Sequence, residues 1–468
     1  MVELIGRDED LRLLDDTYKV RKFKCCAIIG RRRIGKSALI EKFVEDKDNI
    51  YFEFLEGLPE INLRYMENVI GRYKGVKVSY RDFMDAFDDL SAIAKEKKVT
   101  IVFDEFTYAM SYDAFPALTK NLIDRGLGDS YLIISGSLVR MLEAEINDYS
   151  KPLFGRVRII RLNRIGLTES RAFHPKMSEL DLLKLHIISG GSPYYLSETP
   201  ANSLEEYFER YIIPVRSPFH DEGEQILIRE LKEPELYKPI LDALASGKND
   251  VKLISDFAKI DGTTCRSHIS KLLDAGIISE IKPMYDSPKK PVRYRFEDAM
   301  VALHFRVFRK LSFGPLSRYK TYTNAIETEL GRLFEPYCMR FISENYGILS
   351  IGSWFRTILI EKGEESENDA DSRRIKGSVE IDIVSDISDG RNRIELFTEC
   401  KLTKERTGMH ELNELDRKLT HVHGKKNYRR MLISTGGFDP KLADMAETEN
   451  IMLIDIDCIF GHKALPQP

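Results

Sequence analysis

The stretch that decides the fold is Gly30-Arg31-Arg32-Arg33-Ile34-Gly35-Lys36-Ser37, which is followed by Ala38. It fits the pattern G-x-x-x-x-G-K-[ST] at every fixed position. An apolar run at 24–30 precedes it and a helical pattern at 37–46 follows. A loop between a strand and a helix presents backbone N–H groups to a phosphate. The sequence therefore predicts a P-loop, with ATP as the nucleotide.

Each part of this loop has an expected contact with the nucleotide. The glycines let the backbone curl round phosphate oxygens, Lys36 should reach the β- and γ-phosphates, and Ser37 should ligate Mg²⁺. The three arginines at 31–33 should support the phosphates or form a basic lip. The predicted nucleotide-binding residues are Gly30, Arg31, Arg32, Arg33, Ile34, Gly35, Lys36, Ser37 and Ala38.

A second acidic element matches the first. Residues 99–105 form a short apolar run closed by Asp104 and Glu105. We expect Asp104 to hold the Mg²⁺ shell, and Glu105 to orient and polarise the attacking water as the catalytic base. Ser137 follows the next apolar run, where its hydroxyl can contact the γ-phosphate or the water. The alternative for Ser137 is a simple Gly-Ser turn.

Phosphoryl transfer in P-loop enzymes often uses an arginine at the transition state. Arg156 is the first candidate, either at its own nucleotide or at that of a neighbouring subunit. Arg158 and Arg125 compete with it. For each of them the alternative is an ordinary surface arginine.

The order of the remaining elements indicates an α/β protein. Apolar runs alternate with helical patterns, which implies a parallel sheet covered on both faces. With 468 residues the chain is too long for one core, so we expect three or four domains. The further strands predicted in the first part lie at 51–55, 131–134 and 157–162, and the helices at 82–97 and 115–127.

Composition narrows the class of protein. No apolar run approaches the roughly 18 residues of a membrane span. The first residues lack the basic and apolar stretches of a signal peptide, so we expect a cytoplasmic protein without membrane contact. None of the six cysteines forms a C-x-x-C pair, so neither a disulfide framework nor a thiolate zinc site is indicated. The net charge of −4 does not by itself demand nucleic acid.

Residues 250–296 have the pattern of a winged helix. Helices are expected at 253–260 and 264–275, and strands at 277–281 and 292–296, beside a basic loop. Nine Lys or Arg stand against six Asp or Glu. The candidate DNA contacts are Arg266, Ser267 and Lys271 on the second helix and Lys289, Lys290 and Arg293 on the wing. The alternative is a protein–protein or intramolecular module.

The last part reads as α/β after a helix at 322–346, with strands near 379–384, 394–401, 431–434 and 451–454. Residues 361–377 are polar and charged, and we expect a mobile loop there. Period two puts Glu399 and Lys401 on one face, and a hairpin would bring Asp382 beside them. Two carboxylates and a lysine suit hydrolysis of a phosphodiester assisted by Mg²⁺ or Mn²⁺. The alternative is an alternating strand with exposed charges.

Several motifs resemble the archaeal ATPase family, an AAA-related group of signal-transduction ATPases. The resemblance covers about residues 3–300 and rests on the P-loop together with Ile5–Leu11, Ile134–Ser137, Phe154–Arg156 and Gly190–Leu196. It implies an AAA core, a helical lid, a winged helix and often a C-terminal nuclease-like domain. It also implies ATP and Mg²⁺ as cofactors.

The C-terminal residues resemble the PD-(D/E)XK nuclease superfamily. This resemblance implies that Asp382 and Glu399 bind the metal and that Lys401 acts in catalysis. The acid that the superfamily carries on a helix would be Glu335. Pro336 follows it directly, and we expect this proline to disturb a continuous helix.

We therefore predict four domains: an ATPase core at 1–165, a helical lid at 166–245, a winged helix with connector at 246–320, and a nuclease-like domain at 321–468. The leading hypothesis is an ATP-driven switch that binds double-stranded DNA and can cut it. The alternatives are an ATP-regulated scaffold with an inactive nuclease-like domain, or a transcription regulator acting through the winged helix. A homo-oligomer or a protein partner is compatible with each of them.

Overall fold

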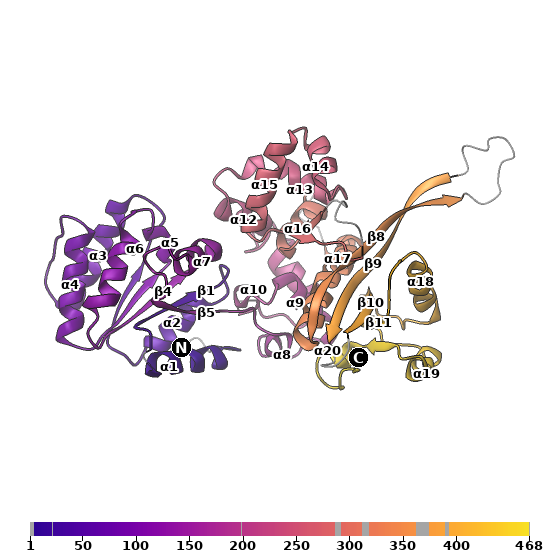
Figure 1. Cartoon of the computed structure of the whole chain (residues 1–468), viewed down its shortest axis with the longest axis horizontal. Helices are drawn as coiled ribbons and strands as arrows, with labels where there is room; N and C mark the ends of the chain where they lie inside the picture. The colour runs from indigo at the N-terminus through magenta and orange to yellow at the C-terminus, as the bar shows by residue number, and fades with distance from the viewer. Residues whose placement is uncertain are drawn as a thin grey trace. The chain divides into compact units, whose positions relative to one another are not determined.

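The computed structural model describes residues 4–20, 22–197, 199–285, 292–310, 318–361, 374–388 and 393–467, with the backbone alone described at 310, 357–361 and 374–377. The chain divides into two units, Met1–Phe173 with Gly191–Glu198, and His174–Gly190 with Thr199–Pro468. Figure 1 follows the chain by colour from end to end. Within the described residues, no helix is both long and apolar enough to span a bilayer.

The first unit is built on a five-stranded parallel sheet in the order β2-β3-β4-β1-β5. The strands are β1 Cys25–Ile29, β2 Asn49–Glu53, β3 Thr100–Asp104, β4 Tyr131–Gly136 and β5 Val157–Arg161. Four of them lie close to their predicted positions. The exception, β2, begins and ends two residues earlier than predicted, because its ladder with β3 runs from Asn49 opposite Thr100 to Glu53 opposite Asp104.

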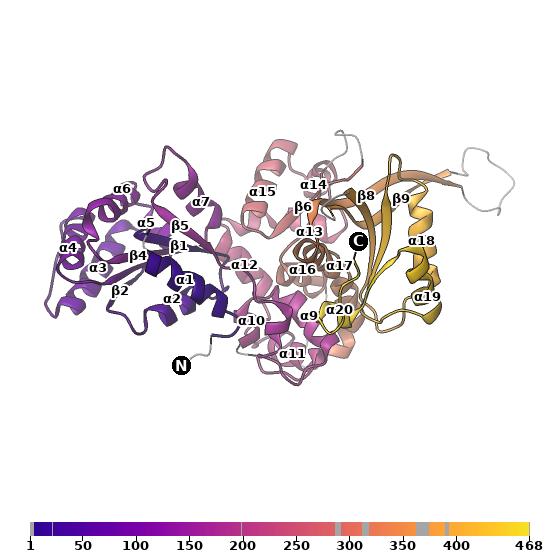
Figure 2. The same cartoon turned by 60° about the horizontal axis from the view of Figure 1, so that its bottom comes forward.

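Helices cover both faces of this sheet, as the alternation of elements predicted. The helices of the whole unit are α1 Asp8–Val20, α2 Lys36–Val44, α3 Pro59–Lys74, α4 Phe83–Glu96, α5 Phe106–Ala109, α6 Phe115–Asn121, η1 Leu122–Gly126, α7 Val139–Asn147, α8 Leu167–Ser170 and α10 Pro193–Ser197. Helices α1 and α2 lie on one face, and α3, α4 and α6 lie on the other (Figures 1 and 2). Successive residues of β3 therefore enter different cores, Ile101 and Phe103 on one side and Val102 on the other.

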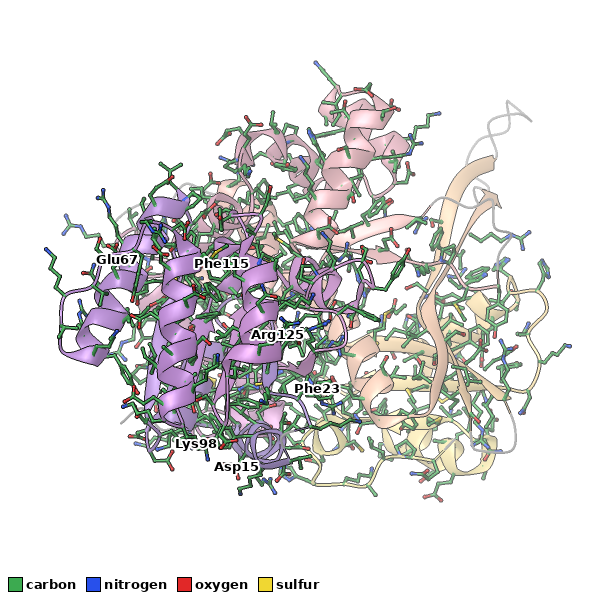
Figure 3. All side chains as sticks on the ribbon, turned by 60° about the vertical axis from the view of Figure 1, so that its left-hand side comes forward. Asp15, Phe23, Glu67, Lys98, Phe115 and Arg125 are labelled. Carbon is green, nitrogen blue, oxygen red and sulfur yellow. The ribbon has the colours of Figure 1, made fainter. Side chains whose placement is uncertain are left out.

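An aromatic cluster fixes the end of β3. Phe103 lies 5.8 Å from the ring of Phe115, and Phe54 lies 5.2 Å from the same ring, as measured between centroids. Figure 3 labels Phe115, the first residue of α6, and Arg125 of η1, which follows α6 directly. Close-packed rings leave little freedom to the backbone they support. The acidic residues directly after Phe103 are therefore held in place from within the core.

The second unit begins with helices, as predicted for this part of the chain. Their bounds are α9 Glu179–Ser189, α11 Leu204–Tyr207, η2 Phe208–Ile212, α12 Glu222–Glu230, η3 Pro234–Leu236, α13 Lys238–Ala245, α16 Ala299–Arg306 and η4 Phe308–Lys310. Serine side chains cap two of them: Ser178 accepts from the amide of Asp181, and Ser203 accepts from that of Glu206.

Two helices and a hairpin follow within this unit. They are α14 Val251–Ala258, α15 Gly262–Asp274, β6 Ile278–Ile281 and β7 Arg293–Phe296, and the two strands are antiparallel. Asp250 caps the first helix and Asp261 caps the second. The predicted basic contacts Lys289 and Lys290 lie outside the described residues.

A mixed five-stranded sheet in the order β12-β11-β10-β9-β8 ends the chain. Its elements are α17 Tyr319–Asn345, β8 Ile348–Glu361, β9 Arg374–Ser388, β10 Arg393–Lys401, α18 Met409–Leu419, β11 Tyr428–Ser434, α19 Pro440–Glu449, β12 Met452–Ile454 and α20 Ile456–Ile459. Strands β8 and β9 are antiparallel neighbours, whereas β10, β11 and β12 run parallel. Helix α17 lies on one side of the sheet and α18 with α19 on the other (Figures 1 and 2).

Three sequence expectations for this part need correction. Helix α17 is continuous across Pro336, because its neighbours Phe334 and Tyr337 are buried and their packing outweighs the lost backbone hydrogen bond. Strand β8 was not predicted, since its residues do not alternate regularly. The predicted loop at 361–377 is shorter, because β8 reaches Glu361 and β9 begins at Arg374; the residues between them lie outside the described part.

Candidate functional site

The P-loop joins the end of β1 to the start of α2. Gly35 has a φ of 94°, a left-handed conformation that glycine adopts without strain, and α2 begins at the next residue. The Lys36 side chain is 5% exposed, and its Nζ donates to the carbonyl oxygens of Gly30 at 3.1 Å and Arg31 at 3.2 Å. The ammonium thus lies inside the loop, where the predicted phosphates would be bound.

Asp104 is the centre of a dense hydrogen-bond network. Its side chain is 1% exposed, and its Oδ2 accepts from Ser37 Oγ at 2.7 Å and from the Tyr51 hydroxyl at 2.6 Å. Its Oδ1 accepts from the hydroxyl of Ser135 and, at 3.0 Å, from the amide of Glu105. Burial, and then the charge of Asp104, raise the pKa of Tyr51, so this tyrosine stays protonated and remains a donor.

Glu105 follows Asp104 directly and has a φ of 49°. Its Oε2 accepts from the Ser137 amide at 3.2 Å and from the Ser137 hydroxyl at 2.9 Å. Its Oε1 is 3.9 Å from Lys36 Nζ. A left-handed backbone is uncommon outside glycine and is characteristic of functional sites. The carboxylate is 21% exposed and is oriented by Ser137 beside the P-loop lysine.

Other segments support the P-loop from outside. Arg7 is 3% exposed and donates to the Ile34 carbonyl at 2.7 Å. The Ser192 hydroxyl donates to the Arg33 carbonyl at 2.7 Å. Two of the motifs quoted above, at 5–11 and 190–196, therefore both contact the P-loop, through Arg7 and Ser192.

Two of the three arginines of the loop, Arg32 and Arg33, contact tyrosines outside it. Arg33 donates to the Tyr195 hydroxyl at 2.9 Å, and its guanidinium lies 4.1 Å from the ring centroid of Tyr194. Arg32 donates to the Tyr108 hydroxyl. In this state Arg32 and Arg33 thus contact tyrosines, and their predicted role at the phosphates would require both to change partners.

The sheet topology separates the two alternatives predicted for Arg156, its own nucleotide or that of a neighbouring subunit. Because β5 runs parallel to β1 and Val157 pairs with Cys25, Arg156 lies at the amino end of the sheet. The P-loop follows Ile29 at the other end, about 15 Å away at about 3.3 Å per residue. Arg156 is moreover bound to Asp124, with 2.9 Å from Nε to Oδ1. It does not reach the nucleotide site of its own chain.

The alternatives Arg158 and Arg125 lie at the same end of the sheet. Arg158 pairs with Cys26 within β5, and Arg125 belongs to η1, which precedes β4. Of the three arginines considered, none is close to the P-loop of this chain.

The residues fit ATP and Mg²⁺. Hydroxyl and carboxylate oxygens are the ligands that Mg²⁺ prefers, and Ser37 and Asp104 bring one of each to within 2.7 Å. The start of α2 and the buried Lys36 supply positive charge where phosphates would lie. The donor set and its place at the carboxyl ends of β1, β3 and β4 are therefore those of a P-loop nucleotide site.

A second group of titratable side chains lies in the C-terminal sheet. Asp382 and Glu399 are on the antiparallel neighbours β9 and β10, one register position beyond the pair Ile383 and Thr398. Asp382 Oδ2 accepts the amide of Cys400 at 2.9 Å. Glu399 is 5% exposed and accepts from Lys418 Nζ of α18 at 2.6 Å. Lys401, the predicted catalytic lysine, is exposed at the end of β10.

Glu335 of α17 belongs to the same group. Burial, and then the charges of Asp382 and Glu380, raise the pKa of Glu335 to about 8. Burial and the charge of Asp382 raise the pKa of Glu399 to about 7. Burial also raises the pKa of Asp382. Carboxyls that disfavour one another's ionisation share one electrostatic environment, so the sheet and α17 bring Glu335, Asp382 and Glu399 together.

The predicted metal set is nonetheless not assembled. Within the described ranges, no three His, Cys, Asp or Glu side chains are gathered in a way that could hold a metal ion. The reason is that Glu399 is turned to Lys418 and Asp382 to the Cys400 amide. Glu335, Asp382 and Glu399 are thus neighbouring carboxyls, two of which have other partners, and their role as metal ligands stays a prediction.

Four side chains that contact these sites were not predicted to have a role. Ser135 and Arg7 lie within motifs that the resemblance quoted, so a signal for them existed. Tyr51 lies in an apolar strand and Lys418 on an amphipathic helix, and neither pattern distinguishes them from neighbours. Their contacts depend on tertiary structure alone.

Comparisons with known proteins agree with the P-loop geometry. Residues 22–170 match a family described as an AAA domain. An uncharacterized protein of Methanocaldococcus jannaschii is 26% identical over 394 residues, 79% of this chain and 86% of that protein. An uncharacterized ATP-binding protein of the same organism is 38% identical over 47 residues, 10% of this chain and 80% of its own length.

Among solved structures, the Walker-type ATPase of Pyrococcus abyssi aligns with a TM-score of 0.49 at 18% identity, covering 65% of this chain and 97% of that one. The family match at 22–170, together with the network around Lys36 and Asp104, makes this part of the chain an AAA-type P-loop ATPase domain. The AAA domain that the resemblance implied is thus confirmed, whereas the winged helix and the nuclease-like domain stay predictions.

Proposed function

We propose that this ATPase drives a switch that acts on duplex DNA through the C-terminal part of the chain. The observation that supports the ATPase half is the Lys36, Asp104 and Glu105 arrangement at the carboxyl ends of neighbouring strands. The observation that supports the second half is the meeting of Glu335, Asp382 and Glu399 beside Lys401.

In the ATPase half each residue has a stated task. Lys36 holds the β- and γ-phosphates inside the loop, and Ser37 with Asp104 provides oxygen ligands. Mg²⁺, when bound there, neutralises charge on the phosphates. Glu105 accepts a hydrogen bond from the attacking water, and so orients and polarises it as the base. Ser137 holds the Glu105 carboxylate in position.

ATP turnover by the purified chain tests this half. Lys36→Ala and Glu105→Gln should each reduce turnover by about a hundredfold or more, because one loses phosphate binding and the other the base. Glu105→Gln should still bind ATP, which a nucleotide-binding assay measures. Unchanged turnover in both variants would remove the proposed roles.

We also propose four functional parts, with limits near 165, 245 and 320, of which residues 250–296 act as a winged helix. The helix pair α14 and α15 followed by an antiparallel hairpin supports this assignment. Arg266 and Lys271 on α15 are the proposed phosphate contacts. The affinity for duplex DNA should fall with rising salt, and this fall should be less steep in Lys271→Ala. Both results would support the winged-helix assignment.

For the carboxyl cluster we propose metal-dependent phosphodiester hydrolysis. Asp382, Glu399 and Glu335 are the oxygen ligands for Mg²⁺ or Mn²⁺, and Lys401 steadies the nucleophile or the phosphate. A bound divalent ion would supply an activated water. Cleavage of plasmid DNA with Mn²⁺, lost in Asp382→Ala and in Lys401→Ala, tests this. An Asp382→Ala protein that cuts as well as the wild type would exclude it.

One observation favours a second candidate. The ion pair of Lys418 with Glu399 occupies a ligand of the metal set, and a fixed pair of this kind suits an ATP-regulated scaffold without cleavage. In that case DNA has no effect on turnover, and manganese does not bind to the C-terminal carboxyls. ATP turnover with and without duplex DNA therefore separates the two functions.

A further inference from the structure

The hairpin of the proposed winged helix is held by the C-terminal sheet. We call β6, residues 282–285 and β7 the wing. Beyond β6 the chain runs along the edge strand β8: the Met284 amide donates to the Ser353 carbonyl at 2.9 Å, and the Ser353 amide donates to the Lys282 carbonyl at 3.2 Å. Pro283 forms a parallel bridge with Ser353. The wing thus adds a short extra strand to the sheet.

The place of contact requires a glycine. A Cβ at Gly352 would lie 2.4 Å from the Lys282 carbonyl oxygen and 3.0 Å from Met284 Cγ. Real Cβ atoms do not approach a backbone oxygen so closely, so the wing fits only because this position has no side chain. The close approach thus depends on the glycine in β8 and on the course of residues 282–284 in the wing.

Side chains of the wing complete the contact on the side of the carboxyl cluster. The guanidinium of Arg293 lies 3.4 Å from the ring centroid of Phe355, and its Nη1 is 3.4 Å from Oε2 of Glu380. Glu380 precedes Asp382 by two residues, so both project from the same face of β9. Cation–π contacts of this kind are worth about 0.5–2 kcal/mol.

A second arginine of the wing reaches α17. Arg295 Nη2 contacts the sulfur of Met339 at 3.4 Å, and its Nε donates to Ser279 of β6 at 3.4 Å. Glu335 lies one turn before Met339 on α17, so this guanidinium contacts the part of the helix that carries the carboxyl. The wing therefore brings two fixed positive charges to the edge of the group that the proposed metal would occupy.

Ser353 connects this contact to the cluster directly. Its backbone bonds the wing on both sides, while its hydroxyl donates to the backbone carbonyl of Asp382 at 2.8 Å. The side chain is 3% exposed. The same residue thus contacts both the wing and the strand segment that carries the central carboxylate.

We propose that the wing is a latch: docked on β8, it holds the carboxyl cluster in its closed arrangement and keeps a divalent cation out. This inference rests on the metal-binding role given to Asp382 above. Arg293 and Arg295 supply positive charge beside the carboxyl cluster, where a cation would otherwise supply it. The contact with β8 holds β9 in place through Ser353. Release of the wing frees Glu380 and removes the support of β9 through Ser353, so that Asp382 and Glu399 can exchange the Cys400 amide and Lys418 for the ion. A winged helix and a metal site then work as one coupled unit.

Gly352→Ala in the full chain is the test, because its methyl group meets the Lys282 carbonyl and leaves every charge unchanged. Gly331→Ala is the matched control, since a Cβ at Gly331 meets nothing within 4 Å. Both are made in an Asp104→Asn background, so that manganese binding at the ATPase site does not contribute to the measurement. The two readouts are amide exchange at Met284 and the Kd for Mn²⁺ from calorimetry, without nucleotide.

We expect faster exchange at Met284 and tighter Mn²⁺ binding in Gly352→Ala only. If the wing is docked in about nine molecules of ten, the apparent affinity for the cation is about tenfold weaker than that of the open form. The Kd for Mn²⁺ should therefore fall by about tenfold in Gly352→Ala. Adding Asp382→Ala should abolish the gain. If Gly352→Ala fails to fold, Arg293→Met, which releases Glu380 but keeps an apolar stem on Phe355, should give the same two changes.

The failures are distinguishable. Faster exchange with equal manganese affinity in Gly352→Ala and Gly331→Ala overturns the latch and leaves the metal site standing. Faster exchange with no manganese bound by either protein overturns the metal site, and the latch with it. Unchanged exchange at Met284 shows that the wing is not held there and overturns the latch alone.

Discussion

Tyr51 donates its hydroxyl to Oδ2 of Asp104 across 2.6 Å, from the strand next to the one that ends in this carboxylate. Ser37 uses the same oxygen at 2.7 Å. When the serine turns to a cation, the tyrosine remains the donor that fixes the rotamer of Asp104. Its burial keeps it protonated. In the proposed ATPase site, Tyr51 is thus a positioning residue for the carboxylate that would bind Mg²⁺.

Tyr51→Phe should therefore lower ATP turnover about 5- to 20-fold. A hydrogen bond to a charged group is worth about 1.5–3 kcal/mol, and part of it is lost when Asp104 can rotate. Because the defect lies in metal placement, the Mg²⁺ concentration for half-maximal turnover should rise while ATP affinity stays nearly unchanged. Titration of Mg²⁺ at saturating ATP measures the first, and a binding assay the second.

Tyr73→Phe is the control for that variant. Its hydroxyl also bonds a carboxylate, Asp48 at 3.0 Å, but on the exposed surface away from the P-loop. Turnover of Tyr73→Phe should match the wild type. Equal Mg²⁺ dependence in Tyr51→Phe and Tyr73→Phe would show that Asp104 does not need its tyrosine.

Ser137 supports the second acid of the same site. Both its amide and its hydroxyl donate to one oxygen of Glu105, so Ser137→Ala removes one donor and keeps the other. We expect kcat to fall about tenfold with little change in KM, because orientation of the base matters in the transition state rather than in binding. Steady-state kinetics checks this. A rise in KM at constant kcat would instead identify Ser137 as a phosphate contact.

Arg156 can contribute to hydrolysis only in a neighbouring copy, because it lies at the amino end of its own sheet. If chains assemble in this way, Arg156→Ala should lower turnover about a hundredfold or more at protein concentrations that support assembly. In dilute protein, where the chain is monomeric, wild type and variant should turn over equally slowly. A loss in Arg156→Ala that persists in dilute monomer would contradict the trans role.

Where local sequence and tertiary structure agree, prediction from the sequence succeeded. The P-loop and its flanking elements depend on two glycines, one lysine and a buried strand, and all of these are local signals. The five strands of the first sheet were foreseen because each is an apolar run bounded by turn residues. The acids at 104 and 105 follow from the same rule, since they end such a run.

Other features are not local and could not be foreseen. Pro336 argues against a helix on intrinsic preference, but two buried aromatic neighbours maintain α17 across it. The partners of Asp104 and Glu399, Tyr51 and Lys418, come from elements distant in sequence, and no residue pattern marks them. Arg156 was placed by a motif, whereas its distance from the P-loop depends on strand direction.

The cluster of Glu335, Asp382 and Glu399 predicts how the free energy of unfolding depends on pH when a chelator keeps metal ions away. Glu335 has a pKa of about 8 and Glu399 of about 7 in the folded chain, and both return to about 4.3 on unfolding. Between these values the folded chain binds more protons than the unfolded chain. Their stabilising contribution is therefore complete below about pH 4 and is lost as the pH rises through about 8.

We accordingly expect the free energy of unfolding of the C-terminal part to fall between pH 6 and pH 8.5, with a decrease in Tm of about 4 °C or more. Glu335→Gln, which has no charge to desolvate, should flatten this slope, whereas Glu344→Gln on the exposed side of α17 should not. Thermal unfolding at several pH values measures all three. If Glu335→Gln keeps the wild-type slope, the glutamate is ionised in the folded chain and the cluster is more open than its contacts indicate.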